Sequence, residues 1–307
     1  MELTKLVNNL AEFSLLPCSA SLISGSNARV HLNRIVTADL LSDKEMTRRE
    51  SLVCDLNGRI ISHLLHADLG SQILLIHSEL SSDNLRKSLS SGIPWNEDVS
   101  ITSGDGAIHR IVLFGRHPNR VLLGLGLNLE ELSPMNWTEY GDCMISSILE
   151  NEQISAFEIL IPHRSLEAII NALEMNGATQ TSTNTWRAIQ SLIRQIDITE
   201  NSTGNLPFEL GLDKIVDLRK GCYPGQEIHA RMESRGVLAR RLVSISTRES
   251  EPPTGRHHLN EKERVEILSS HIVGDTWISL GLVSTKAHIP TESVLHSEDS
   301  SINVTVA

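Results

Sequence analysis

Hydrophobic residues in the first third of the chain fall in runs that predict a strand, a helix and a three-stranded meander. Residues 20–41 predict a strand, a Ser-Gly-Ser-Asn turn and a helix that begins near Asn27, with apolar residues one turn apart. Within 51–77, Asn57-Gly58 separates two apolar runs, which is a strong hairpin signal, and a third apolar run follows. A short helix over 83–91 ends this predicted unit.

The middle of the chain repeats this plan. Strands are predicted over 98–103 and 107–114, joined through Gly104-Asp105-Gly106, and over 142–149 and 154–161 around a polar turn. A helix with one apolar face follows and ends at Gly177, which suits a left-handed stop. Sheets made of hairpins with helices on one face indicate an α+β fold.

The pattern changes beyond Arg235, where the helical period disappears. Short alternating runs predict a small β-barrel or sandwich. The Pro- and Glu-rich stretch 249–263 is expected to be a long connection between strands, and the last ten residues are expected to be loosely ordered.

Composition indicates a folded protein without a membrane span. The chain has 307 residues, of which 40% are hydrophobic and 21% charged, and no apolar run approaches the ~20 residues that cross a bilayer. The acidic start lacks a signal or transit pattern, which predicts a cytoplasmic protein. The four cysteines are widely spaced, so reduced thiols are expected and no zinc or redox pair is indicated.

Charge argues against direct nucleic-acid binding. The formal net charge is −11, and only 3% of residues are aromatic, which leaves little for stacking on bases. The segment 219–241 runs against this trend, because it holds six Lys or Arg residues and only Glu227 and Glu233. An anionic ligand could collect there. Many of those arginines could equally be solvated surface.

The densest cluster of unusual residues is the segment 218–231, LRKGCYPGQEIHAR. Two glycines and a proline predict a turn in which backbone N–H groups can approach a ligand. Lys220, Arg231 and a helix start would favour the thiolate of Cys222, which could then act as a nucleophile, be oxidised or bind iron transiently. The alternative is a small buried thiol at a tight turn.

This segment, K-G-C-Y-x-G-Q-E followed by A-R, resembles the signature of YgfZ-type proteins in the GcvT folate-binding family. The resemblance extends to Pro207 and Glu209 before the loop, to the stretch around Thr37 and Asp39, and to the hairpin at 55–60. It also covers AFEILIP, where relatives carry an acid that faces the pterin. The similarity spans roughly 30–241.

The resemblance implies α+β lobes around a central folate cavity, closed by a C-terminal β-barrel. The implied division is a folate-binding region at 1–235, with lobes of about 1–120 and 121–235, and a barrel-like domain at 236–307. The implied cofactor is tetrahydrofolate or a derivative, and the implied working thiol is Cys222. Glu158 becomes the candidate pterin contact, and the other implied cofactor-binding residues are Asp39, Arg187, Lys220, Gly221, Tyr223, Gly225, Gln226, Glu227 and Arg231.

The sequence departs from the family in two places. Aminomethyltransferases of the family carry an aspartate after the hairpin, whereas the corresponding stretch here, Ile60 to His63, has no acid. This argues against classical glycine-cleavage chemistry. His63 could act as a base, but a histidine between apolar strand residues is more often structural or exposed. The family's arginine-led strand and G-x-P are also altered, with Arg187 as the matching arginine, which puts the strength of folate binding in question.

Three functions follow from the resemblance and its departures. The first is a folate-binding accessory protein for iron–sulfur protein assembly or repair, with an indirect effect on tRNA modification, whose partners are folate and iron–sulfur proteins or their assembly machinery. The second is a tetrahydrofolate-dependent one-carbon transferase using Asp39 or Glu158. The third is a scaffold that has lost folate. Dinucleotide, nucleophile-elbow and preformed metal motifs are not found in the sequence.

Overall fold

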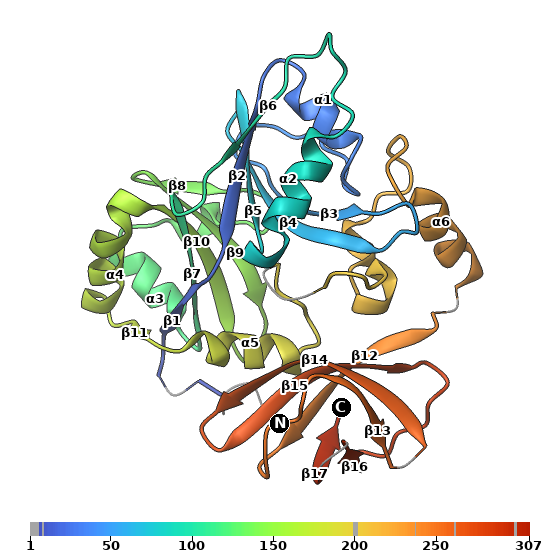
Figure 1. The fold of residues 1–307 in the computed structure, drawn as a ribbon. Coiled ribbons are helices and arrows are strands. Elements are labelled where there is room, and N and C mark those ends of the chain that lie inside the picture. Colours follow the sequence, from blue (N-terminus) through green and yellow to red (C-terminus); the bar gives the residue numbers. More distant parts are fainter. Residues whose placement is uncertain (1–5, 8, 199–201, 237, 261, 298–299) are drawn as a thin grey trace.

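The computed structural model describes residues 6–7, 9–198, 202–236, 238–260, 262–297 and 300–307. These residues form two β-sheets and a closed β-barrel, with helices packed between and around them (Figure 1). No helix in the described part of the chain is long and apolar enough to cross a membrane.

The first sheet is the predicted meander with two added strands. Its order is β3-β4-β5-β2-β6, and every neighbouring pair is antiparallel. Residues of α1 and α2 bury Leu32, Leu85 and Leu89 in a core with Leu64 and Leu75 of the sheet. The elements are β2 (Ser19–Ser24), α1 (Ala28–Asn33), β3 (Arg48–Cys54), β4 (Ile60–Asp68), β5 (Gln72–His77), α2 (Ser82–Ser90) and β6 (Ser100–Ser103). The predicted helix over 83–91 is confirmed, and so is the predicted helix start near Asn27, but that helix ends at Asn33 and does not continue to residue 41.

The second sheet has the order β11-β1-β7-β10-β9-β8. α3 and α4 cover it, and the predicted stop at Gly177 is confirmed by its positive φ of 91°. The elements are β1 (Glu12–Leu16), β7 (Ile108–Gly115), α3 (Pro118–Gly124), β8 (Thr138–Tyr140), β9 (Cys143–Glu150), β10 (Ser155–Pro162), α4 (Leu166–Met175), β11 (Thr179–Gln180) and α5 (Thr183–Leu192).

Chain order and sheet membership do not coincide. β6 and β7 occupy the predicted ranges, but β6 pairs with β2 in the first sheet and β7 pairs with β1 and β10 in the second. The Gly104–Gly106 turn therefore carries the chain from one sheet to the other. A lobe boundary near residue 120 does not separate the sheets, because β1 and β7 belong with the later strands.

The C-terminal part closes into a barrel in the order β12-β15-β14-β13-β16-β17. Two expectations for this region were wrong. The stretch 249–263 contains β13, and the last ten residues contain β17, whose alternating Ile302, Val304 and Val306 fill the barrel core. The strands are β12 (Arg240–Thr247), β13 (Gly255–Leu259), β14 (Glu263–Val273), β15 (Thr276–Ser284), β16 (Glu292–His296) and β17 (Ser301–Val306).

Short helical segments connect the barrel to the sheets. α5 packs on β14 and β15, and its Trp186 lies in one apolar cluster with Phe114 of β7 and Ile278 of β15. The 3-10 turns η5 (Pro207–Leu210) and η6 (Asp213–Ile215) then lead to α6 (Gln226–Arg235). These connections place η6 beside β3, where two cavities open.

Candidate functional site

Two adjoining cavities lie at the junction of the two sheets. One has a volume of about 410 Å³ and the other about 230 Å³. They share Arg48 and Glu50 of β3 and Lys214 and Ile215 of η6 as lining residues. The larger volume lies within the range of roughly 300–1,000 Å³ that is usual for small-molecule sites. The cavities therefore provide one candidate binding region with two branches.

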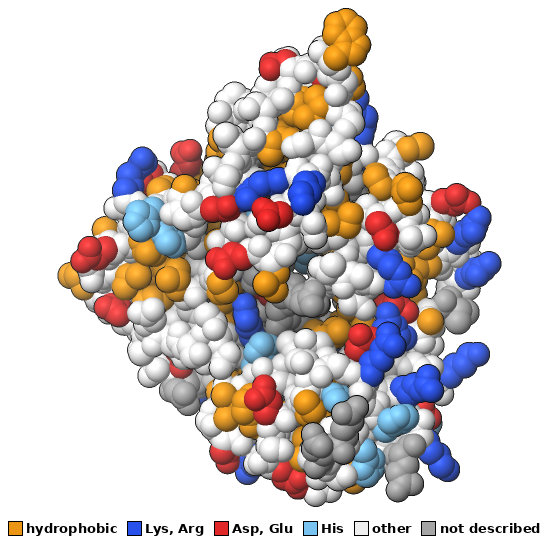
Figure 2. Space-filling model, in the orientation of Figure 1, with side chains coloured by type: hydrophobic (Ala, Val, Ile, Leu, Met, Phe, Trp, Pro, Cys, Tyr) orange, Lys and Arg blue, Asp and Glu red, His pale blue; other side chains and the backbone are white. Residues whose placement is uncertain are grey.

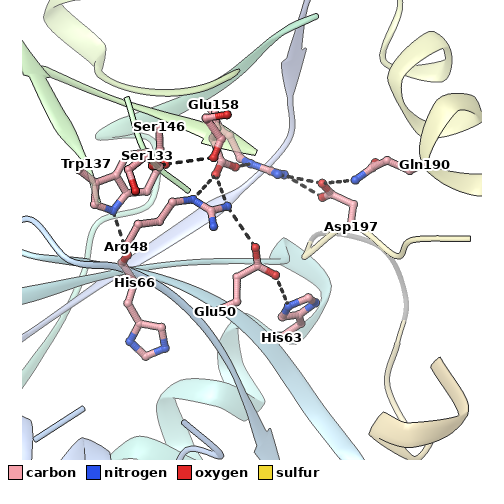
Figure 3. Close-up of polar contacts among 12 residues, drawn as sticks. Arg48, Glu50, His63, His66, Ser133, Trp137, Ser146, Glu158, Gln190 and Asp197 are labelled. Carbon is pink, nitrogen blue, oxygen red and sulfur yellow. Dashed lines mark hydrogen bonds and ion pairs between the residues drawn. The ribbon is translucent and has the colours of Figure 1, made fainter. Parts of the chain in front are cut away.

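Glu158 of β10 is fully buried behind these cavities. Its Oε2 accepts hydrogen bonds from Arg48 Nε at 3.2 Å and Arg48 Nη2 at 2.7 Å, and its Oε1 accepts one from Arg110 Nε. Figure 3 shows the Arg48 guanidinium directed at this carboxylate. Glu158 is not among the residues that line either cavity. The geometry therefore does not favour the expected direct contact between Glu158 and a pterin.

Arg110 of β7 extends the network toward the barrel side. Its Nη1 and Nη2 donate to the two oxygens of Asp197, each at 2.8 Å, and Gln190 Nε2 of α5 donates to Asp197 at 3.3 Å. Burial lowers the pKa of Arg110, but the charges of Asp197 and Glu158 outweigh it and raise that pKa above its usual value. The guanidinium stays charged and joins two buried carboxylates.

Glu50 is the carboxylate that lines both cavities. Its side chain is 29% exposed and accepts hydrogen bonds from Arg48 Nη2 at 3.1 Å and His63 Nε2 at 3.1 Å (Figure 3). His63 lies on β4 diagonally across from Glu50, because Glu50 pairs with Leu65 in the ladder. Burial raises the pKa of Glu50, but the hydrogen bond from His63 and the charge of Arg48 lower it to about 2. Glu50 is therefore ionised at neutral pH.

His63 occupies the stretch where the family's aspartate is missing. It is buried, in agreement with the structural alternative, but it also bonds the cavity-facing carboxylate. Its Nδ1 has no hydrogen-bond partner among the described residues. His63 thus contributes to the site through Glu50.

The Cys222 loop packs on the hairpin at 55–60 and not on the cavities. Gly225 adopts a φ of 83°, and a Cβ there would lie 2.5 Å from the Cα of Gly58, so only glycine fits. His229 Nε2 bonds the carbonyl of Gly58 at 2.8 Å, and its Nδ1 bonds Tyr223 Oη at 3.2 Å. The predicted helix start is confirmed at Gln226, and Cys222 itself is exposed.

The cations expected to flank Cys222 are engaged elsewhere. Lys220 is buried, and its Nζ donates to the carbonyl of Asn33, the last residue of α1, and to the carbonyl of Val36 at 2.7 Å. Burial lowers the pKa of Lys220 to about 8. Arg231 pairs with Glu227 one turn away on the exposed side of α6. Lys220 therefore fastens the loop to the first sheet, and both cations expected to flank Cys222 already have other partners.

Of the predicted cofactor-binding residues, Asp39 lines the larger cavity. Arg187 lies on α5, so the segment expected to match the family's arginine-led strand is a helix. Neither cavity is lined by the remaining predicted residues, which are Glu158, Arg187, Lys220, Gly221, Tyr223, Gly225, Gln226, Glu227 and Arg231, or by Cys222.

Sequence reasoning missed the residues that do line the site. Arg48 and Glu50 stand two positions apart on one strand, so they share a face of the sheet. Charged residues on one face of an otherwise apolar strand were the signal that could have found them. The partners Arg110 and Asp197 come from distant segments, and only the fold brings them together.

The basic residues of 219–241 do not all face one common site. Figure 2 shows Lys and Arg side chains on the side of the molecule that carries α6 and the barrel. A groove of about 590 Å³ there is lined by Arg59, Arg240, Arg256 and Arg264, but Arg240 is paired with Glu209 at 2.6 Å and Glu266 at 2.7 Å. In the described part of the chain, no three His, Cys, Asp or Glu side chains group closely enough to hold a metal ion.

Comparison with known proteins gives one local and one global likeness. No family model matches the chain. Over 44 residues, the chain is 50% identical to the iron-sulfur cluster assembly factor IBA57 homolog, mitochondrial, of Mycosarcoma maydis, a match that spans 14% of this chain and 11% of that protein. The structure matches the glycine cleavage system aminomethyltransferase T of Bartonella henselae with a TM-score of 0.76 and 16% identity, over 99% of this chain and 87% of the other.

The global match confirms the predicted α+β, GcvT-like fold with a C-terminal barrel. The local match adds sequence similarity to a protein named as an iron–sulfur cluster assembly factor. Together they support the YgfZ/GcvT-type folate-binding family that the Cys222 motif predicted.

Proposed function

From this family, we propose that the chain is a folate-binding accessory protein for the assembly or repair of iron–sulfur proteins, with Cys222 as its working thiol. The observation that carries the proposal is the 44-residue match, half identical, to a protein named as an iron–sulfur cluster assembly factor. The proposed partners are iron–sulfur proteins or their assembly machinery, and an effect on tRNA modification would be indirect. The cytoplasmic location stays a prediction, since the matched relative is named as mitochondrial.

The residues of the central cavities fit a reduced folate. The larger cavity has the volume of a small-molecule site, and Glu50 offers an ionised carboxylate to an N–H edge such as that of a pterin. Lys214 is exposed at the shared lining and forms no ion pair with a described residue, so it could meet an anionic glutamyl tail. Tetrahydrofolate would supply a carrier for a one-carbon unit.

Cys222 suits contact with a protein partner. Its thiol is exposed on a loop that is anchored on both sides, by Lys220 and by the Gly225–Gly58 contact. A fixed exposed thiol can meet a client without a conformational change in the cavity. In this proposal, ligand binding and thiol chemistry occupy separate parts of the molecule.

The proposal is tested in a host strain that lacks its own factor of this kind. Complementation with the wild-type chain should restore the activity of a [4Fe–4S] enzyme, and Cys222→Ala should not. Cys18→Ala is the matched control, because Cys18 is half-buried and lies outside the loop. Full activity with Cys222→Ala, at equal protein levels, would refute the role of the thiol.

A one-carbon transferase is the second candidate, because Asp39 and Glu50 both line the larger cavity. Purified protein would be assayed for turnover of glycine, sarcosine and dimethylglycine with tetrahydrofolate. Turnover that is lost in Glu50→Gln would favour this candidate. Failure with all three amines would leave the accessory role.

A further inference from the structure

Two carboxylates near the cavities differ in what they can offer a ligand. Glu158 is fully buried and lines neither cavity, whereas Glu50 lines both and is 29% exposed. Both belong to the same network, because Arg48 bonds each of them. Of these two carboxylates, Glu50 is therefore the one that can contact a molecule bound in the cavities.

The two carboxylates also differ in how many of their acceptor sites are already used. A carboxylate has about four acceptor sites. Glu158 uses three of them for guanidinium N–H groups of Arg48 and Arg110. Glu50 uses one site on each oxygen, for Arg48 and for His63. Toward the residues that the structure describes, one acceptor site on each oxygen of Glu50 is left unused, which is the pattern that a two-donor edge requires.

The orientation of Glu50 is fixed before any ligand arrives. Arg48 holds one oxygen and is itself held by Glu158, while His63, buried on the neighbouring strand, holds the other (Figure 3). Because Arg48 already has Glu158 as a counter-charge, neutralising Arg48 does not require Glu50. A preorganised carboxylate loses little freedom on binding, which favours affinity.

Resting on the proposed function, we propose that Glu50 is the carboxylate that pairs with the N–H edge of the folate ring and that His63 is its positioning residue. Glu158, the acid that the family resemblance selects, then has a structural role, because it holds Arg48 and Arg110 in place. The ligand class that this geometry favours is a flat heterocycle with two adjacent N–H donors, such as a 2-amino-4-oxopyrimidine.

The test is anaerobic calorimetric titration of the full chain with tetrahydrofolate and with an analogue that lacks the 2-amino group. The wild type should bind tetrahydrofolate, and Glu50→Gln should weaken binding at least about 20-fold, since hydrogen bonds to charged groups are the strong ones. The analogue should bind the wild type correspondingly weakly. It should lose less affinity in Glu50→Gln than tetrahydrofolate does, because the analogue has already lost one of the two hydrogen bonds to Glu50.

His63→Leu tests the positioning role. It should weaken binding in the wild-type background and have little further effect in Glu50→Gln, a coupling that a merely structural role for His63 would not produce. Melting curves check that each variant is folded.

The outcomes separate the two proposals. If the wild type binds no folate, the proposed function fails and this inference fails with it. If the wild type binds and Glu50→Gln binds equally well, the inference is overturned while folate binding stands. Equal losses from the missing 2-amino group in the wild type and in Glu50→Gln would also overturn it.

Discussion

The central charge network and the Cys222 loop are held in opposite ways. In the network, Arg48 and Arg110 bridge carboxylates that come from both sheets and from the segment before η5, and all of these charged groups except Glu50 are buried. In the loop, backbone contact at Gly225 and one buried lysine fix an exposed thiol. Conspicuous motif residues therefore build and anchor the loop, while ordinary strand residues such as Arg48 and Glu50 line the central cavities.

The largest effect is expected from breaking the network at its centre. Arg110→Leu would leave Glu158 and Asp197 without their shared counter-charge, and removing one partner of a buried ion pair costs about 3–5 kcal/mol. Denaturant unfolding measures the loss. The control is Arg120→Leu, an exposed residue on α3, which should change stability by less than about 0.5 kcal/mol. Equal effects of the two variants would show that the network does not stabilise the fold.

In the Cys222 loop, the most damaging substitution is expected at Gly225. Gly225→Ala combines a φ of 83° with a Cβ placed 2.5 Å from Gly58, and we expect a loss of about 2–3 kcal/mol in unfolding free energy. Gly236→Ala is the matched control, because Gly236 also has a positive φ, of 61°, but has no atom within 4 Å of its added Cβ. It should cost about 1 kcal/mol. If the two variants are equally stable, the contact with the hairpin is not what holds the loop.

Acid should weaken the network through Glu50. Its pKa is about 2 in the folded protein and 4.5 ordinarily, so its stabilising contribution is present above pH 4.5 and is lost as pH falls toward 2. Thermal melting of wild type and Glu50→Gln between pH 6 and 3 should show a wild-type advantage on the order of 2 kcal/mol at pH 6 that shrinks below pH 4.5. A difference that stays constant with pH would contradict the depressed pKa.

The smallest effect is expected at Cys222. The exposed side chain contributes little packing, so Cys222→Ala should change the unfolding free energy by less than about 0.5 kcal/mol. Its iron–sulfur phenotype would then arise from lost chemistry and not from lost protein. A larger loss of stability would mean that the thiol is part of the loop's anchoring.

Local pattern predicted the elements far better than their pairing. The meander at 51–77 and the stop at Gly177 follow from turn residues and periodicity, which are local properties. The separation of β6 from β7 was not predictable in this way, because both strands have the same short pattern and the choice of sheet depends on distant partners. β17 was missed because its alternation follows a polar turn near the end of the chain.

The same limit applies to the site. The loop motif predicted a turn and a helix start, and both are present, but a motif does not state which way its side chains face. The Lys220 side chain bonds backbone carbonyls at and just after the end of α1 and does not face Cys222's surroundings as a free cation. The Glu158 carboxylate is bonded by Arg48 and Arg110. Glu50 carries no motif, and its importance emerges only when β3, β4 and η6 meet around the cavity.

The most direct test of this account is a side-by-side titration of Glu50→Gln and Cys222→Ala with tetrahydrofolate. The account predicts that Cys222→Ala binds like the wild type, while Glu50→Gln binds at least about 20-fold more weakly. That result would separate the ligand cavity from the working thiol. A loss of binding in Cys222→Ala as large as in Glu50→Gln would contradict the separation and place the thiol at the ligand.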